Sequence, residues 1–222
     1  MEATLPLREN LTYPRCAGGR HPGDRGRHGC SHFAHGRRVW EGSRHSGQQS
    51  WPGRSVPFES FSDEQWARAV DINLMGCVRT CRTLLPNMAA LGSASVVNIA
   101  SDLAKQPEPG LMAYGACKAA LLHVTKNLAK EYAPKIRVNA VSPGPVWTRL
   151  WTRPGGIVDQ LVAHYGVDKD AALKRFLEER SMPLGIGQPE DVAHAAVFLV
   201  SPLAKFITGA NLDVGGTLRG LV

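Results

Sequence analysis

Residues 95–118, SVVNIASDLAKQPEPGLMAYGACK, carry the pattern that decides the fold. The first six residues are mostly apolar and β-branched, which is typical of a short strand buried on both faces. After a loop with two prolines, a long helical pattern runs over residues 113–132. Residues 136–141 (IRVNAV) form a second predicted strand, which a Pro-Gly pair ends. Strand, helix and strand in this order predict an α/β fold with a parallel sheet.

Further elements are predicted on both sides of this unit. Ser62 followed by Gln65 fits a capping box that opens a helix. Apolar residues at helical spacing continue this pattern, at Leu74, Val78, Cys81 and Leu85. Two more helices and a final strand are predicted over residues 168–180, 189–200 and 211–214.

Tyr114 and Lys118 form the sharpest chemical feature. Residues four apart share one face of a helix, so the ammonium lies near the phenol. A nearby cation stabilises the phenolate and lowers a tyrosine pKa that is normally about 10 toward neutrality. Such a tyrosine can act as general acid or base for a carbonyl/alcohol pair. A surface Tyr–Lys pair would show the same spacing, so this signal is weak by itself.

Two loops at strand ends add to this feature. Ser101 directly follows the first strand, and residues 139–148 (NAVSPGPVWT) end the second with a Gly-containing loop. In open α/β sheets ligands bind beyond the carboxyl ends of strands. A serine hydroxyl there can hydrogen-bond a substrate oxygen, and a glycine lets the backbone approach a ligand closely. The alternatives are a helix cap and an ordinary Pro-Gly turn.

The order and spacing of these motifs resemble the short-chain dehydrogenase/reductase family. The resemblance covers residues 57–222. It rests on Asn73-Leu-Met-Gly76, Ser101, Tyr114-x-x-x-Lys118, Pro143-Gly-x-x-x-Thr148 and Gly209 to Gly216 (GANLDVGG). It implies a Rossmann-like, doubly wound parallel sheet, NAD or NADP as cofactor, and a small-molecule substrate whose ketone and secondary alcohol are interconverted. The family often forms homodimers or homotetramers through two long helices and the last strand.

The resemblance also implies residue roles. Tyr114 is the proton donor or acceptor, and Lys118 holds the nicotinamide ribose hydroxyls. Ser101 orients the substrate oxygen, and Asn73, in a locally kinked helix, helps to hold a water in a proton relay. The stretch 147–180 resembles the substrate lid of the family. The nicotinamide end of the cofactor is lined by Pro143, Gly144, Val146 and Thr148, besides the Tyr–Lys pair.

The first quarter of the chain departs from the family pattern. Residues 1–56 contain no Ile, no Lys and no Gly-rich turn between an apolar strand and a helix, which dinucleotide binding needs. The sheet is therefore predicted to be incomplete in its N-terminal half, with an open edge and weak cofactor binding. One hypothesis is an out-of-frame translation, since codons for residues 45–51 (HSGQQSW) can read Thr-Leu-Val-Asn-Asn-Pro-Gly one base later. The alternative is a genuine Arg-rich tail that is disordered by itself.

Charge and composition narrow the function classes. The net charge of +7 is concentrated in residues 1–56, which hold nine arginines and four acidic residues, against 17 basic and 15 acidic residues beyond. Nucleic-acid binding by this segment is an alternative, but no aromatic stacking platform accompanies the arginines, so no nucleic-acid partner is predicted. No segment suits a membrane or a signal peptide, which predicts a cytoplasmic location.

Two further questions concern metal binding and catalytic competence. No metal site is predicted, because the candidate ligands match no standard spacing: Cys16, His21, His28, Cys30, His32 and His35. Cys117, beside Lys118, is interpreted as a small packed residue rather than a reactive one. The alternative to an active enzyme is a non-catalytic family member that acts only as an oligomer or interaction partner.

Overall fold

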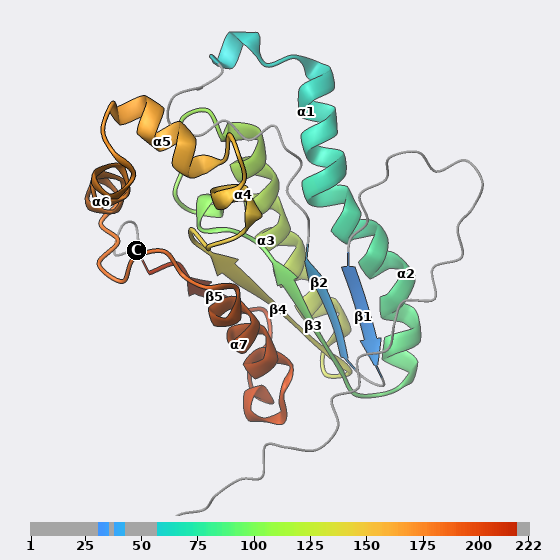
Figure 1. Cartoon of the computed structure of the whole chain (residues 1–222). Helices are drawn as coiled ribbons and strands as arrows, with labels where there is room; N and C mark the ends of the chain where they lie inside the picture. The colour runs from blue at the N-terminus through green and yellow to red at the C-terminus, as the bar shows by residue number, and fades with distance from the viewer. Residues whose placement is uncertain (1–30, 36–37, 43–56, 217–222) are drawn as a thin grey trace, which may run out of the picture.

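The computed structural model describes residues 31–35, 38–42 and 57–216, which form one sheet with helices on both faces (Figure 1). The strands lie in sequence order across the sheet and run parallel from the second to the fifth, while the first is antiparallel to the second. The predicted α/β fold with a parallel sheet is thus confirmed. The strands are β1 (Ser31–His35), β2 (Arg38–Gly42), β3 (Ala94–Ile99), β4 (Ile136–Pro143) and β5 (Asn211–Val214).

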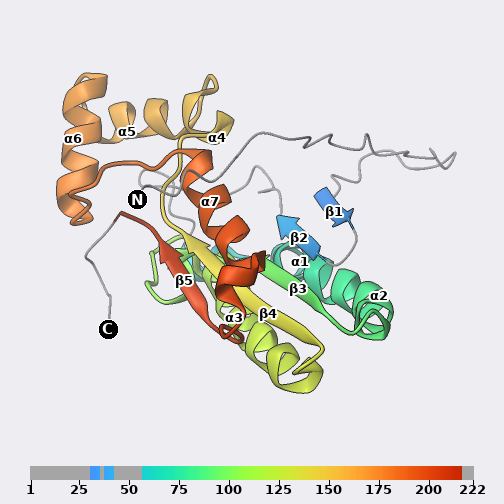
Figure 2. The ribbon, with the colours of Figure 1, turned by 90° about the horizontal axis from the view of Figure 1, so that it is seen from below.

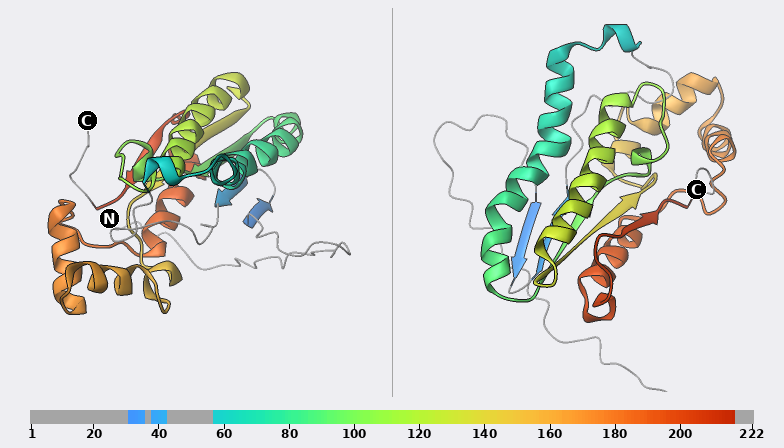
Figure 3. Two further views of the ribbon diagram at one scale, coloured as in Figure 1. Left: turned by 90° about the horizontal axis from the view of Figure 1, so that it is seen from above. Right: turned by 180° about the vertical axis from the view of Figure 1, so that it is seen from behind.

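The helices form three groups around this sheet. One face is covered by α1 (Asp63–Val70), the π-helical turn η2 (Asp71–Met75), α2 (Gly76–Ala90) and α3 (Met112–Tyr132). The opposite face carries α7 (Pro189–Val200), as Figures 2 and 3 show. Beyond the carboxyl ends of the strands lies a lid of α4 (Arg149–Thr152), α5 (Ile157–Tyr165) and α6 (Lys169–Glu179). Short 3-10 turns complete the set: η1 (Phe58–Ser60), η3 (Asp102–Ala104) and η4 (Pro202–Ala204).

The predicted elements agree closely with the observed ones. The Ser62 hydroxyl accepts a hydrogen bond from the Gln65 backbone, and the Gln65 side chain accepts one from the Ser62 backbone, which completes the capping box. Sequence patterns missed α4 and α5, which are short. The buried face of α2 also differs in part from the predicted apolar stripe, because Val78 is only half-buried. The residues of α2 that reach the core are Cys77, Cys81, Leu85 and Met88.

Alternation along the central strands divides the sheet core into two layers. Val96 and Val138 pack with the residues of α2 and α3 on one face. Val97 and Val141 pack with Ala196 and Leu199 of α7 on the other. Because both faces are covered, β3 and β4 are apolar on both sides, as their sequences predicted. The carboxyl ends of these strands point toward the lid (Figure 1).

The lid has a hydrophobic cluster of its own. Trp151 and Phe176 are buried in it and meet edge to face, with ring centroids 5.4 Å apart. The predicted charged helix over residues 168–180 is α6, which Asp168 caps through hydrogen bonds to two backbone amides. The lid therefore packs largely on itself rather than against the sheet.

The segment before residue 57 is described only at β1 and β2. Both strands lie where the composition predicted no strand, and β2 pairs with β3. The edge of β3, which the sequence predicted to be open, is thus covered in the structure. The hypotheses on residues 1–30 and 43–56 lie outside the described residues. In the part of the chain that the structure describes, no helix combines the length and apolarity needed to cross a membrane.

Candidate active site

The Tyr–Lys pair lies on the buried face of α3. Tyr114 is 7% exposed and Lys118 is fully buried. The Lys118 Nζ lies 5.6 Å from the centroid of the Tyr114 ring and donates a 2.8 Å hydrogen bond to the carbonyl oxygen of Ile99. A buried ammonium needs such an acceptor to offset its lost hydration. The carbonyl at the end of β3 therefore anchors the lysine head beside the phenol, and the pair does not lie on the surface.

Ser101 follows β3 directly and is buried as well. Its Oγ donates to the Asp102 Oδ1 at 3.0 Å and accepts from the Leu103 amide at 3.2 Å, so the serine caps η3. This turn packs against the start of α3, where a Cβ on Gly115 would come within 3.0 Å of the Leu103 carbonyl oxygen. The glycine next to Tyr114 thus lets the Ser101 loop approach the helix closely.

Asn73 lies in the π-helical turn η2, which matches the locally kinked helix that the resemblance implies. Widened turns of this kind are frequent at functional sites. The Asn73 Nδ2 donates to the Ala69 carbonyl at 2.9 Å, while its buried Oδ1 has no partner among the described residues. Ordered water is a common partner of such a group. Since η2 packs against α3, this unpaired acceptor belongs to the same layer as Lys118.

The loop proposed for the nicotinamide end follows β4. Pro143 is the last residue of the strand and pairs with Val214 of β5. The Gly144 amide donates to the Val214 carbonyl at 3.0 Å. A Cβ on Gly144 would lie 2.7 Å from the Gly215 Cα, so backbone packing alone already requires this glycine. The tight Pro-Gly loop is therefore built by the approach of the two strand ends.

The same loop continues into the lid. Val146 forms an isolated parallel bridge with Gly187, and the Trp147 amide donates to the Gly187 carbonyl at 2.9 Å. Thr148 occupies the N-cap position of α4 and is exposed. The four residues Pro143, Gly144, Val146 and Thr148 thus line one loop that joins the sheet to the lid.

Sequence reasoning missed an acidic residue next to Ser101. The Asp102 Oδ1 accepts from the Ser101 hydroxyl and, at 2.8 Å, from the Leu103 amide. Burial raises the pKa of this carboxyl above its ordinary value, although its two hydrogen bonds and Arg180 act in the opposite direction. Arg180 itself forms an ion pair with Glu108, which links the lid to the loop after η3. Only the fold joins these residues, because 72 positions separate the two partners.

The structure describes the side chain of Cys117 but not those of the candidate metal ligands in the first quarter of the chain. Cys117 is 3% exposed, and burial raises the pKa of its thiol, so a packed side chain describes it well. The side chains of the six Cys and His residues between positions 16 and 35 lie outside the described residues.

Comparisons with known proteins identify the family. A family model described as Enoyl-(Acyl carrier protein) reductase matches residues 49–217. The chain is 35% identical over 160 residues to the 3-oxoacyl-[acyl-carrier-protein] reductase FabG of Chlamydia pneumoniae. This match covers 71% of this chain and 58% of the relative. It is also 36% identical over 160 residues to the human Dehydrogenase/reductase SDR family member 4. This second match covers 70% of this chain and 51% of the relative.

Solved structures agree with these relatives. The L-sorbose reductase of Gluconobacter frateurii, complexed with NADPH and L-sorbose, is 29% identical at a TM-score of 0.69, over 78% of this chain and 65% of the other. The chain therefore belongs to the short-chain dehydrogenase/reductase family and has its Rossmann-like fold. It spans between 51% and 63% of the length of the curated relatives it matches. The family match begins at residue 49, earlier than the Pro57 from which the sequence motifs were recognised.

Proposed function

We propose that this site belongs to an NAD(P)-dependent oxidoreductase that interconverts a ketone and a secondary alcohol, with Tyr114 as the acid/base. The observation that carries the proposal is the buried Lys118, whose Nζ is held by the Ile99 carbonyl beside the Tyr114 ring. A Tyr–Lys pair on the surface of a helix would not have its ammonium held in this way. The ammonium favours the phenolate by charge attraction, which suits a tyrosine that gives up and takes back a proton.

Each of the four catalytic residues has a role in this proposal. In the reducing direction the Tyr114 hydroxyl gives its proton to the carbonyl oxygen, and in the oxidising direction the phenolate takes it back. The Ser101 hydroxyl orients the same oxygen. Asn73 offers its unpaired Oδ1 to a water that returns the proton toward Lys118. A bound NAD or NADP supplies or accepts the hydride.

The described residues fit the nicotinamide end of the cofactor better than its phosphates. The loop of Pro143, Gly144, Val146 and Thr148 lies at the carboxyl end of β4, where such ligands bind in open sheets. Lys118 reaches the same end of β3 through the Ile99 carbonyl. Residues 1–56 hold no Gly-rich phosphate turn, so we expect this chain to bind NADH and NADPH weakly.

Exposed apolar side chains support a homo-oligomer. Phe206 is 100% exposed, Leu203 84% and Val197 62%, and they lie on or beside α7 and the approach to β5. Apolar groups of this size gathered on a surface often mark an interface. The same surface would serve the alternative function, in which the chain is a non-catalytic partner in an oligomer.

Turnover at high cofactor concentration tests the proposal. The chain is supplied with millimolar NADH or NADPH and a panel of ketones, while cofactor fluorescence reports binding separately. We expect slow ketone reduction that Lys118→Ala weakens together with cofactor binding. Absence of both cofactor binding and reduction would favour the non-catalytic partner, which cofactor binding would exclude. Loss of neither property in Lys118→Ala would contradict the assigned site.

The nature of residues 1–56 needs a separate test at the level of the gene. We propose that the stretch before about Arg54 is an out-of-frame translation of a family N-terminal half. The gene, read in all three frames, should then continue upstream of His45 into apolar strand patterns and a Gly-rich turn that opens a helix. Stop codons close to His45 in the shifted frame would instead establish a genuine Arg-rich tail.

A further inference from the structure

The side chain of Asn98 connects β3 to two of the helices that pack on one face of the sheet. Its Nδ2 donates a 2.9 Å hydrogen bond to the Thr125 Oγ1 of α3, and its Oδ1 accepts one at 3.3 Å from the Cys77 Sγ of α2. All three side chains are buried, and Asn98 is only 1% exposed. The cluster around them is otherwise apolar, so the Asn98 amide depends on these two partners for its hydrogen bonds.

The hydroxyl of Thr125 sets the direction of this network. Its Oγ1 already donates to the Leu121 carbonyl at 2.8 Å, and a hydroxyl has one proton to donate, so toward Asn98 it can only accept. The Asn98 amide must therefore turn its nitrogen toward α3 and its oxygen toward α2. A shift of α3 along the sheet would leave a buried amide without its partner, which costs free energy. The network therefore favours a single placement of α3 against β3.

The next residue of β3 holds the lysine of the proposed active site. The Ile99 carbonyl accepts the 2.8 Å hydrogen bond from the Lys118 Nζ, and Ile99 directly follows Asn98. Lys118 and Thr125 are separated by about two helical turns, so they lie on the same face of α3. Neighbouring residues of the strand thus hold α3 at two points. Because a lysine stem is flexible, the position of its ammonium depends on how α3 is placed.

We propose that Asn98 and Thr125 are positioning residues that keep the Lys118 ammonium beside the Tyr114 ring. Their hydrogen bond fixes α3 where the Ile99 carbonyl can hold Lys118, and they act through this contact rather than on the substrate. The proposal rests on the proposed function for the roles of Tyr114 and Lys118. Without the Asn98–Thr125 contact, the ammonium would lie farther from the phenol and would stabilise the phenolate less.

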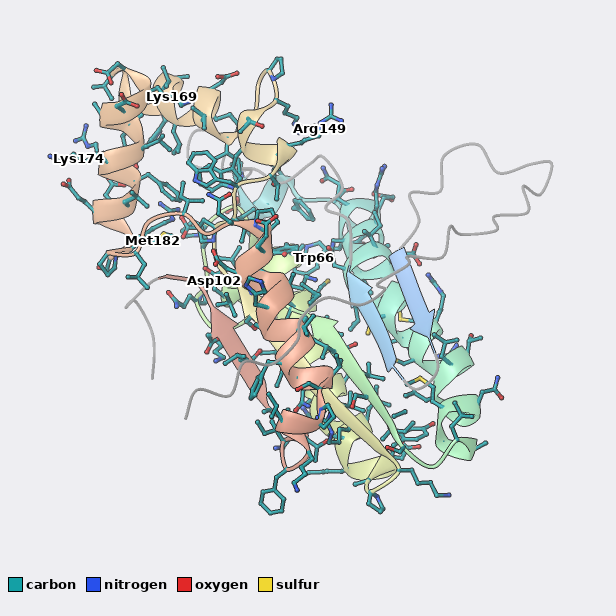
Figure 4. The ribbon with its side chains drawn as sticks, turned by 60° about the horizontal axis from the view of Figure 1, so that its bottom comes forward. Trp66, Asp102, Arg149, Lys169, Lys174 and Met182 are labelled. Carbon is teal, nitrogen blue, oxygen red and sulfur yellow. The ribbon has the colours of Figure 1, made fainter. Side chains whose placement is uncertain are left out.

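The pKa of Tyr114 reports the position of the ammonium. The Lys118 Nζ lies 5.6 Å from the ring centroid, so a displaced ammonium changes the attraction on the phenolate. Other ionisable groups of this region are Cys117, next to Lys118 on α3, and Asp102 on η3, which packs against α3 (Figure 4). Thr125→Val retains both groups and removes a hydroxyl without changing any charge. A raised Tyr114 pKa in this variant would therefore indicate that Lys118 has moved.

Two measurements on the full chain test the positioning role. NMR of ring-labelled tyrosine measures the Tyr114 pKa, and lysine acetylation, read by mass spectrometry, measures how well Lys118 is protected. Thr125→Val should raise the Tyr114 pKa by at least about one pH unit and make Lys118 acetylation at least about fivefold faster. Thr125→Ser restores the hydroxyl and should keep both values close to those of the wild type. Ser95→Ala is the matched control: on the same strand it removes a buried acceptor of Arg137, and it should change neither value.

Three results would overturn the positioning role: an unchanged Tyr114 pKa in Thr125→Val, an equal change in Ser95→Ala, or no recovery in Thr125→Ser. Faster lysine acetylation does not rescue the first result, because with an unchanged pKa it indicates a merely structural network. If Thr125→Val does not fold by circular dichroism, Asn98→Ala decides by the first two criteria. That variant removes the amide, while the Thr125 hydroxyl keeps its other partner.

A failure of the proposed function would look different. A wild-type Tyr114 pKa of about 10 or above would contradict its role as the acid/base. Acetylation of Lys118 alone would then decide the positioning role. A rate that rises in Thr125→Val but not in Ser95→Ala would support it, and any other pattern would overturn it.

Discussion

The helix α3 and the lid of α4 to α6 are built in opposite ways. The buried face of α3 is embedded in the molecule, where Leu121 and Ala129 join the sheet core and Lys118 reaches the end of β3. The lid instead surrounds its own cluster, with Trp151 and Phe176 at its centre. The proposed Tyr114–Lys118 pair thus lies on a helix that packs against the sheet, while the lid is a separately packed unit.

Few links join the lid to the layer below. One is the Glu108–Arg180 ion pair, while the Val146–Gly187 bridge joins the segment that enters the lid to the segment that leaves it. The Arg180 guanidinium also lies over the Phe176 ring, 4.3 Å from its centroid, so the ion pair continues into the lid cluster.

The largest expected effect comes from the chemistry on α3. Tyr114→Phe removes the proposed acid and should lower kcat by about 10²–10⁴-fold, with little change in the melting temperature. Initial rates at saturating cofactor measure this. Tyr132→Phe, at the far end of the same helix, is the matched control and should keep its rate. A near-normal kcat for Tyr114→Phe at neutral pH would remove Tyr114 from the mechanism.

A cavity created in the lid should lower the local stability of the lid without lowering that of the sheet and α3. Phe176 is fully buried, so Phe176→Ala should cost about 3–5 kcal/mol where its contacts are lost. Because the lid packs on itself, hydrogen exchange should speed up in α5 and α6 but stay slow in β3, β4 and α3. Leu85→Ala, in the sheet core, should accelerate exchange in α2, α3 and the strands instead. Uniform loss of protection in Phe176→Ala would show that the lid and the sheet unfold together.

Breaking the ion pair between the lid and the loop after η3 should have a smaller effect on the free energy of unfolding. The Glu108 and Arg180 side chains are 21% and 12% exposed, so Glu108→Gln removes a negative charge that faces a largely buried guanidinium and should cost about 1–2 kcal/mol. Glu178→Gln breaks an exposed pair with Lys174 on α6 and should cost less than about 0.5 kcal/mol. Urea titration of both variants compares them. Equal costs would mean that the Glu108–Arg180 link contributes no more than a surface pair.

The smallest effect concerns the pH dependence of stability at Asp102. Burial raises the pKa of its carboxyl in the folded state, so its contribution to stability is full below the unfolded pKa, near 3.9, and is lost as pH rises through the folded pKa. Asp102→Asn does not titrate and should avoid that loss. Thermal unfolding should show that the stability of the variant relative to the wild type is greater at pH 7 than at pH 3. A constant difference over this range would contradict a titrating Asp102.

The sequence by itself determined the elements whose signals are local. The bounds of α7 and β5 agree residue by residue with the predicted ranges, and α3 begins one residue early. Period, caps and β-branched runs depend on neighbours within a few residues, which is why they can be read without the fold. The i, i+4 spacing likewise placed Tyr114 and Lys118 on one face of a helix.

Only the tertiary structure decided what surrounds those residues. The carbonyl that holds Lys118 belongs to Ile99, and the partner of Arg180 is Glu108, so both contacts bring together parts of the chain that no local pattern relates. The neighbourhood of Asp102 emerged in the same way, because burial and opposing charges come from the packing of the lid against the loop after β3. Electrostatics and desolvation depend on distance in space rather than along the chain, and therefore the environment of the site could be known only once the chain was folded.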